Sequence, residues 1–200
     1  EVNIDSSSVS GINSGFTVEA TGSREDNSTT DYVAAGFVAK SNSTKINDAK
    51  VNNLKTVTST DDGGYSGGFI GISKTGGLAE VGDETEIKKL ISANGLLNAV
   101  GYLIPSYQQC YVSYVDNGGV RGDIAGGFVG DFQSGIVEND ENNAYAIQNI
   151  SYVKGKTYAG GFGGKVYSGA LADSTKGISI LGGLADLNIQ ISDLLSLIQV

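Results

Sequence analysis

The stretch Gly126-Gly127-Phe128-Val129-Gly130 (GGFVG) decides the fold, because close copies of it recur along the chain. The other copies are Ala35-Gly36-Phe37-Val38, Gly67-Gly68-Phe69-Ile70-Gly71 and Gly160-Gly161-Phe162-Gly163-Gly164. Their phenylalanines stand at positions 37, 69, 128 and 162, at intervals of 32, 59 and 34 residues. Such intervals indicate an internal structural repeat, with an insertion of about 25 residues in the long interval.

A second, shorter element precedes each phenylalanine and has the spacing apolar-x-apolar-x-x-apolar. Its four occurrences are Phe16-x-Val18-x-x-Thr21, Ala49-x-Val51-x-x-Leu54, Cys110-x-Val112-x-x-Val115 and Tyr145-x-Ile147-x-x-Ile150. An isoleucine often stands just before it, as Ile12, Ile46 and Ile136 do. Each repeat therefore has one predicted order, which is a short strand, a polar turn, a Gly-Gly-Phe strand and a second polar turn.

A single repeat of this kind cannot bury an apolar face, but stacked copies can. The sequence therefore predicts an all-β fold, a right-handed parallel β-helix or β-solenoid with a helical insertion. Phe37, Phe69, Phe128 and Phe162 are predicted to point into one continuous core, stacked at the inter-strand spacing of ~4.8 Å. A β-sandwich of short strands is the alternative, although a sandwich does not need a sequence repeat.

The long interval is predicted to hold a helical insertion at 83–105 within a single repeat domain, 1–200. Asp83-Glu84-Thr85-Glu86 has the pattern of a helix capping box, and apolar residues with helical spacing follow it. The sequence after Phe162 has the same plan, so residues 180–200 are predicted to begin a second, truncated helical insertion. A parent chain would then continue with a proline and a further strand.

The composition excludes several functions. The chain has 13 basic and 22 acidic residues, a net charge of −9, which argues against nucleic acid as a partner. Histidine is absent, so Ser-His-Asp triads, Cys-His pairs and His-based zinc sites are impossible. The single cysteine, Cys110, cannot form an internal disulfide. Polar residues interrupt the apolar tail from Ile178 to Val200, so no membrane insertion is expected.

The tripeptide Arg121-Gly122-Asp123 is the sequence by which some ligands bind integrins. It occupies the turn position that Lys154-Gly155-Lys156 fills in the next repeat. A three-residue match has low specificity, and the simpler interpretation is a turn in which glycine stands between two polar residues.

Three other groups of residues are candidates for chemistry. The acidic candidates for calcium ligands or paired acids are Asp61, Asp62, Asp116, Asp123 and Asp131. The tyrosines that could form a sugar-stacking face are Tyr107, Tyr111, Tyr114, Tyr145, Tyr152 and Tyr158. Cys110 aligns with Ala49 and Tyr145 in the repeat, and is expected to be a small buried residue. Solvated turn carboxylates and ordinary strand tyrosines are the simpler interpretations of the other two groups.

The GGFVG units, the insertion ending at Ile104-Pro105 and the following Gln109-Cys110-Tyr111-Val112 resemble repeats of very large surface proteins of Gram-positive gut bacteria. These are related in style to adhesin repeats of the GLUG type, and the resemblance covers roughly residues 31–200. It implies secretion, cell-wall attachment through other parts of the parent chain, and an adhesin-like role. The implied partners are other repeats of that chain and surface glycans or proteins of host or bacteria.

Three functions follow as hypotheses. The first is a monomeric structural or adhesive segment with no enzymatic activity, no cofactor and no metal. The second is a carbohydrate-binding surface module, which predicts an exposed aromatic strip. The third is a polysaccharide-active β-helix enzyme, which predicts two carboxylates facing each other across a groove.

Overall fold

The computed structural model of the chain describes residues 2–22, 31–60, 62–74, 104–140 and 145–167. These residues form strands and turns and contain no helix, and the strands pair in parallel. The prediction of an all-β fold is therefore confirmed. The insertion predicted at 83–105 lies outside the described residues except for Ile104 and Pro105, and the one predicted at 180–200 lies wholly outside them.

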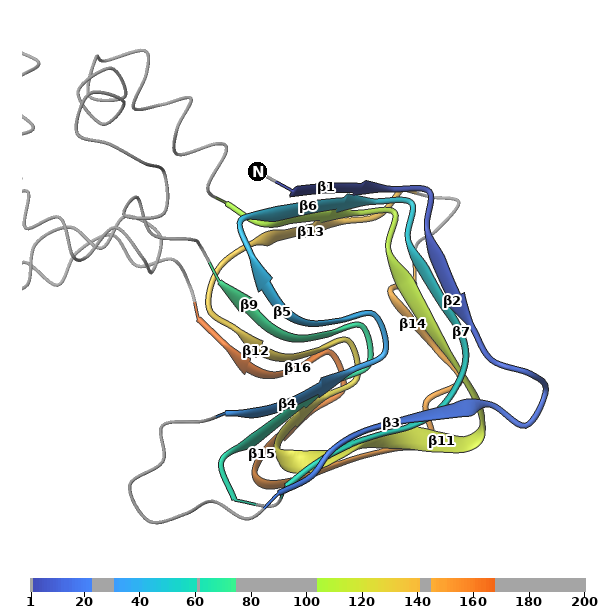
Figure 1. Cartoon of the computed structure of the whole chain (residues 1–200), viewed down its shortest axis with the longest axis vertical. Helices are drawn as coiled ribbons and strands as arrows, with labels where there is room; N and C mark the ends of the chain where they lie inside the picture. The colour runs from blue at the N-terminus through green and yellow to red at the C-terminus, as the bar shows by residue number, and fades with distance from the viewer. Residues whose placement is uncertain (1, 23–30, 61, 75–103, 141–144, 168–200) are drawn as a thin grey trace, which may run out of the picture.

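The chain follows a similar path four times, and we call each passage a layer (Figure 1). Layer 1 contains β1 (Val2–Asp5), β2 (Ser8–Ser10), β3 (Phe16–Ala20), β4 (Tyr32–Ala35) and β5 (Val38–Asn42). Layer 2 contains β6 (Thr44–Asn47), β7 (Lys50–Ser59), β8 (Gly64–Gly67) and β9 (Ile70–Lys74). Layer 3 contains β10 (Ser106–Gln108), β11 (Tyr111–Gly126) and β12 (Val129–Phe132). Layer 4 contains β13 (Ile136–Glu138), β14 (Ile147–Gln148), β15 (Tyr152–Gly160) and β16 (Gly163–Val166).

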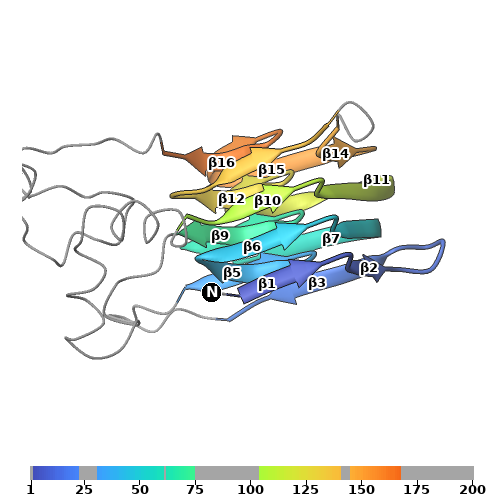
Figure 2. The ribbon, with the colours of Figure 1, turned by 90° about the horizontal axis from the view of Figure 1, so that it is seen from above.

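Three sheets receive strands from every layer. Sheet 1 has the order β1-β6-β10-β13, and sheet 3 has the order β5-β9-β12-β16, so both follow the order of the chain. Sheet 2 is curved and contains the remaining strands, with the long β7 and β11 each pairing with several shorter ones. Figure 2 shows the layers one above another, with β1 and β3 at one end and β15 and β16 at the other.

The corner between sheets 1 and 2 depends on residues that tolerate a left-handed backbone. Ser6, Asp48 and Gln109 occupy equivalent corner positions and have φ of 46°, 49° and 52°. Short polar side chains adopt this conformation more readily than branched ones do. The backbone N–H of each donates to a carbonyl of the following layer, at 3.1, 2.9 and 2.9 Å. Polar turn residues therefore both bend the chain and join adjacent layers.

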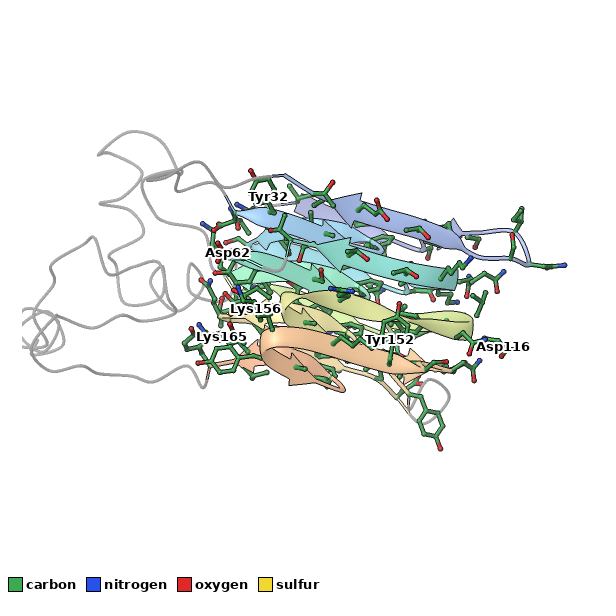
Figure 3. The ribbon with its side chains drawn as sticks, turned by 90° about the horizontal axis from the view of Figure 1, so that it is seen from below. Tyr32, Asp62, Asp116, Tyr152, Lys156 and Lys165 are labelled. Carbon is green, nitrogen blue, oxygen red and sulfur yellow. The ribbon has the colours of Figure 1, made fainter. Side chains whose placement is uncertain are left out.

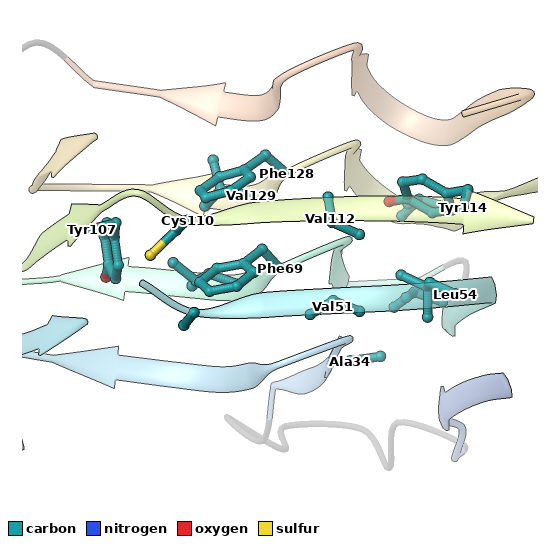
Figure 4. Close-up of a cluster of buried hydrophobic side chains, with 14 of the residues drawn as sticks. Ala34, Val51, Leu54, Phe69, Tyr107, Cys110, Val112, Tyr114, Phe128 and Val129 are labelled. Carbon is teal, nitrogen blue, oxygen red and sulfur yellow. The ribbon is translucent and has the colours of Figure 1, made fainter. Parts of the chain in front are cut away.

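The core lies inside the three sheets. In β7 the side chains of Val51, Leu54 and Val57 are fully buried, and Val51 pairs in register with the buried Val112 of β11. Figure 4 shows these side chains stacked from layer to layer. Each such burial contributes about 1.5–3 kcal/mol, so the alternating apolar positions hold the layers together.

The structure corrects the predicted alignment of the first repeat. Val9, and not Val18, is the layer 1 partner of Val51, whereas Val18 pairs with Val57 further along β7. Phe16 lies opposite Leu54. The cause is the segment 11–15, which separates β2 from β3 and carries a turn closed by the bond from Gly15 N to Ile12 O at 2.8 Å.

The predicted isoleucine positions are wrong in two of three repeats. Ile46 is buried, but Ile12 is 77% and Ile136 is 44% exposed. In register with Ile46 stand Ile4 in β1 and Tyr107 in β10, and Val137 of β13 pairs with Tyr107. Because side chains alternate across a strand, the one-residue offset between Ile136 and Val137 places Ile136 on the outer face.

Candidate functional site

The four repeated phenylalanines stack as a ladder through the layers. The ring centroids are 4.8 Å apart for Phe37 and Phe69, 5.0 Å for Phe69 and Phe128, and 5.3 Å for Phe128 and Phe162, with planes within 9°. Phe69 and Phe128 are fully buried and Phe37 is partly buried. Phe162 departs from the expected continuous core, since it is 40% exposed where no described layer covers it.

The Gly-Gly-Phe sequence forms a corner between strands, which corrects its prediction as a strand. In layer 2, Gly68 and Phe69 connect the end of β8 to the start of β9. A Cβ on Gly36 would lie 2.3 Å from Gly68 O, one on Gly68 would lie 2.0 Å from Gly127 O, and one on Gly127 would lie 2.1 Å from Gly161 O. The second glycine is therefore required by the backbone of the following layer.

The glycine two residues after each phenylalanine of layers 2–4 faces the opposite way. A Cβ on Gly71 would lie 2.6 Å from Ala39 O, one on Gly130 would lie 2.7 Å from Gly71 O, and one on Gly164 would lie 2.7 Å from Gly130 O. This position is therefore restricted by the preceding layer. In layer 1 it is occupied by Ala39, which is exposed.

Two tyrosines proposed for a sugar-binding face are buried instead. Tyr114 is 3% exposed, and its hydroxyl donates to Gly127 O at 2.7 Å. Tyr107 is fully buried, and its hydroxyl donates to Ser41 Oγ at 2.8 Å and lies 2.6 Å from Ser73 Oγ. Burial raises the pKa of the Tyr107 hydroxyl to about 12. Ser41 and Ser73 belong to β5 and β9, so this network joins sheets 1 and 3.

The exposed tyrosines do not present a continuous stacking surface either. Lys165 Nζ lies over the rings of Tyr158 and Tyr167, 5.6 and 5.3 Å from their centroids. Lys154 Nζ lies 5.0 Å from the centroid of the Tyr152 ring. These cation–π contacts occupy ring faces that a sugar would need. Figure 3 shows Tyr152 and Lys165 at separate places on the surface.

Arg121-Gly122-Asp123 lies inside β11 rather than in a free turn. The equivalence with the next repeat holds, because Arg121 pairs with Lys154 and Gly122 with Gly155. The Asp123 carboxylate accepts hydrogen bonds from Gly63 N, at 3.0 Å, and from Thr157 Oγ1. The aspartate therefore ties β11 to both neighbouring layers, and is not held out on a loop as an integrin ligand would require.

The acidic candidates do not come together. Asp62 and Asp116 are exposed and lie at opposite sides of the molecule in Figure 3. Asp61 lies outside the described residues. Within the described ranges, no three residues of the types His, Cys, Asp and Glu are grouped so as to hold a metal ion.

Asp131 is the one acidic candidate with an unusual environment. It is 2% exposed, Gln133 Nε2 donates to its Oδ2 at 2.8 Å, and its Oδ1 has no hydrogen-bond partner among the described residues. Burial raises the pKa of this carboxyl, and the bond from Gln133 and the charge of Lys165 oppose the shift. A raised pKa can mark a catalytic acid, but no second carboxylate faces Asp131 across a groove.

We expect Asp131→Asn to stabilise the chain at pH 7 by roughly 1 kcal/mol. The pKa of the carboxyl is higher in the folded chain than its ordinary 3.8. Its favourable contribution is therefore complete below pH 3.8 and is lost as the pH rises through the folded-state pKa. Urea titrations of wild type and variant between pH 3 and pH 8 should show a difference that shrinks toward acid pH. An unchanged difference across this range would contradict the assignment.

Cys110 is a small core residue, as its alignment with Ala49 suggests. It is fully buried, and its Sγ donates to Gln108 O at 3.2 Å. Burial raises the pKa of the thiol to about 11 from its usual 9.0. The native thiol should thus react with a disulfide reagent at pH 8 at least about 100-fold more slowly than in urea-unfolded chain, since two pKa units reduce the thiolate fraction that much. Equal rates would contradict this burial.

A shallow groove on the outer face of sheet 1 has a volume of about 490 Å³. Its polar lining comes from Asn3, Asp5, Lys45, Asn47, Ser106 and Gln108. Asn47 Nδ2 donates to Asp5 Oδ1 at 2.8 Å, and Gln108 Nε2 donates to Glu138 Oε2 at 3.2 Å. Amides and carboxylates thus form a row across the layers, and sequence reasoning missed it because these residues lie on four separate strands.

The fold places this chain among all-β proteins built from parallel strands. No family model, no curated protein and no solved structure matches it. In the part of the chain that the structure describes, no helix is long and apolar enough to cross a membrane.

Proposed function

We propose that this chain is a β-solenoid segment of a longer bacterial surface protein, with a structural and adhesive role. The carrying observation is the stack of four layers, in which the phenylalanine rings repeat at 4.8, 5.0 and 5.3 Å. Parallel pairing throughout supports a solenoid over a sandwich, because sandwiches are built from antiparallel sheets. Each layer adds ~4.8 Å along the stack, so many layers can present a distal binding domain away from a cell wall.

The proposal includes an extracellular location, attachment to the cell wall through other parts of the parent chain, and no enzymatic turnover. Carboxylates that are dispersed or tied into hydrogen bonds support the absence of turnover, as Asp123 illustrates. The test is a screen of the purified chain against polysaccharides and model glycosides, with and without calcium. We expect no product. Reproducible product formation that Asp131→Asn abolishes would overturn the proposal.

A mechanical measurement tests the structural role directly. Layers 3 and 4 are offset by 30 residues where Ser106 pairs with Ile136. If single layers unfold in turn when the chain is pulled from both ends, the length released per step should be about 100 Å, at ~3.5 Å per residue. Extension at low force without such steps would contradict a stalk.

Carbohydrate binding is a second candidate, and the groove on sheet 1 is the observation that favours it. Its amide and carboxylate row, with Asn47 and Gln108 at the centre, offers hydrogen-bond donors and acceptors of the kind that sugar hydroxyls pair with. A glycan array distinguishes the two candidates. Saturable binding that Asn47→Ala weakens without loss of fold would support the binding module.

A further inference from the structure

The last described layer ends on a corner whose steric requirement is not met within the described residues. A Cβ on Gly36, Gly68 or Gly127 would lie 2.0–2.3 Å from a carbonyl oxygen of the following layer. Gly161 stands at the same position in layer 4, yet a Cβ there would have no described atom within 4 Å. Nothing in the four layers therefore requires glycine at position 161.

The hydrogen bonds of the corners point to the same open side. Phe37 N donates to Phe69 O at 3.1 Å, Phe69 N to Phe128 O at 2.8 Å, and Phe128 N to Phe162 O at 2.9 Å. Each layer thus donates to the next. For Phe162 N, no described carbonyl takes the corresponding place.

Apolar side chains are also uncovered at this end. Phe162 is 40%, Tyr158 is 49% and Val166 is 59% exposed. Their register neighbours in layer 3, Phe128 and Ile124, are 0% and 7% exposed because a layer lies on both sides of them. Figure 2 shows β15 and β16 as the outermost strands of the stack at this end.

We propose that layer 4 is a docking surface for a fifth layer with a Gly-Gly-Phe-x-Gly corner, supplied by the longer chain of the proposed function, on which this inference rests. The fifth layer would place a glycine carbonyl over Gly161, accept the Phe162 N–H and extend the phenylalanine ladder. Its last glycine is required because a Cβ there would meet the carbonyl of Gly164, as one on Gly164 would lie 2.7 Å from Gly130 O.

A second copy of this chain does not fit as the occupant. Layer 1 is the copy's open layer on the side that would have to meet layer 4, and it carries Ala39 where layers 2–4 carry glycine. The Cβ of Ala39 would stand where the carbonyl of Gly164 has to lie. The partner is therefore a layer with glycine at this position, and self-association through this surface is not expected.

The test uses the full chain and a synthetic peptide with the sequence of residues 119–133, which contains one complete corner. In the chain alone, the Phe162 amide should exchange hydrogen much faster than the Phe128 amide. The peptide should bind saturably and slow exchange at Phe162. Binding should fall at least about tenfold with the chain variant Gly161→Ala, and equally with a peptide in which Gly130 is replaced by alanine.

Three results would overturn the docking surface. One is a Phe162 amide that is protected in the chain alone, since another segment or a second copy would then already cover layer 4. Another is the absence of any peptide-induced protection, and the third is binding that Gly161→Ala leaves unchanged. None of these depends on the polysaccharide screen, so a failed docking surface and a failed structural role are separately recognisable.

Discussion

Replacing Phe128 by alanine is expected to lower the free energy of unfolding by about 3–5 kcal/mol, the range found for buried aromatic residues. The ring is fully buried between those of Phe69 and Phe162, at 5.0 and 5.3 Å. Its removal would leave a cavity in the middle of the ladder, where the backbones above and below are fixed by hydrogen bonds and cannot close it. Urea denaturation followed by circular dichroism measures the loss.

Phe162→Ala is the matched control for this prediction. Phe162 has one stacking neighbour among the described residues and is 40% exposed. Removing it uncovers less apolar surface, so we expect a loss of about 1–2 kcal/mol. Equal losses for the two variants would mean that the ladder is not what stabilises the stack.

Gly68→Ala is expected to destabilise the chain by about 3 kcal/mol, the upper part of the range for overpacking a core. The new Cβ would lie 2.0 Å from both Gly127 O and Tyr114 Oη. Tyr114 cannot move aside freely, because it is buried and its hydroxyl is bonded to Gly127 O. The layers would have to separate locally, which weakens the ladder as well.

Gly161→Ala provides the control, since it makes the same chemical change at the same position of another layer. No described atom would lie within 4 Å of the new Cβ, so the stability should change by less than about 0.5 kcal/mol. Thermal unfolding of wild type and both variants gives the comparison. Similar destabilisation by Gly68→Ala and Gly161→Ala would contradict the proposed direction of glycine contacts.

The repeat could be predicted from sequence because its residues are set by backbone geometry. Glycine at positions such as 68 and 127 is required by a carbonyl about 2 Å from the missing Cβ, so the pattern survives in the sequence. The strand register of layer 1 could not be predicted, because the extra residues at 11–15 move Val9 into the position that the spacing assigned to Val18.

The polar sites were less predictable, because they depend on contacts between layers. Asp123 bonds to Gly63 and Thr157, which stand 60 and 34 residues away, and its tripeptide gave no sign of them. The Tyr107 hydroxyl meets Ser41 and Ser73 only because three strands converge. Local patterns predict secondary structure and repeats, whereas such partners follow from tertiary structure.

The direction of the glycine contacts has a consequence for synthesis. Gly68 is restricted by Gly127, which leaves the ribosome 59 residues later, and Gly36 is restricted in the same way by Gly68. A nascent chain can therefore close each corner before the residue that tests it has been made. A substitution at Gly68 would stay silent during translation of layer 2, and the misfit would first arise when layer 3 emerged and failed to dock.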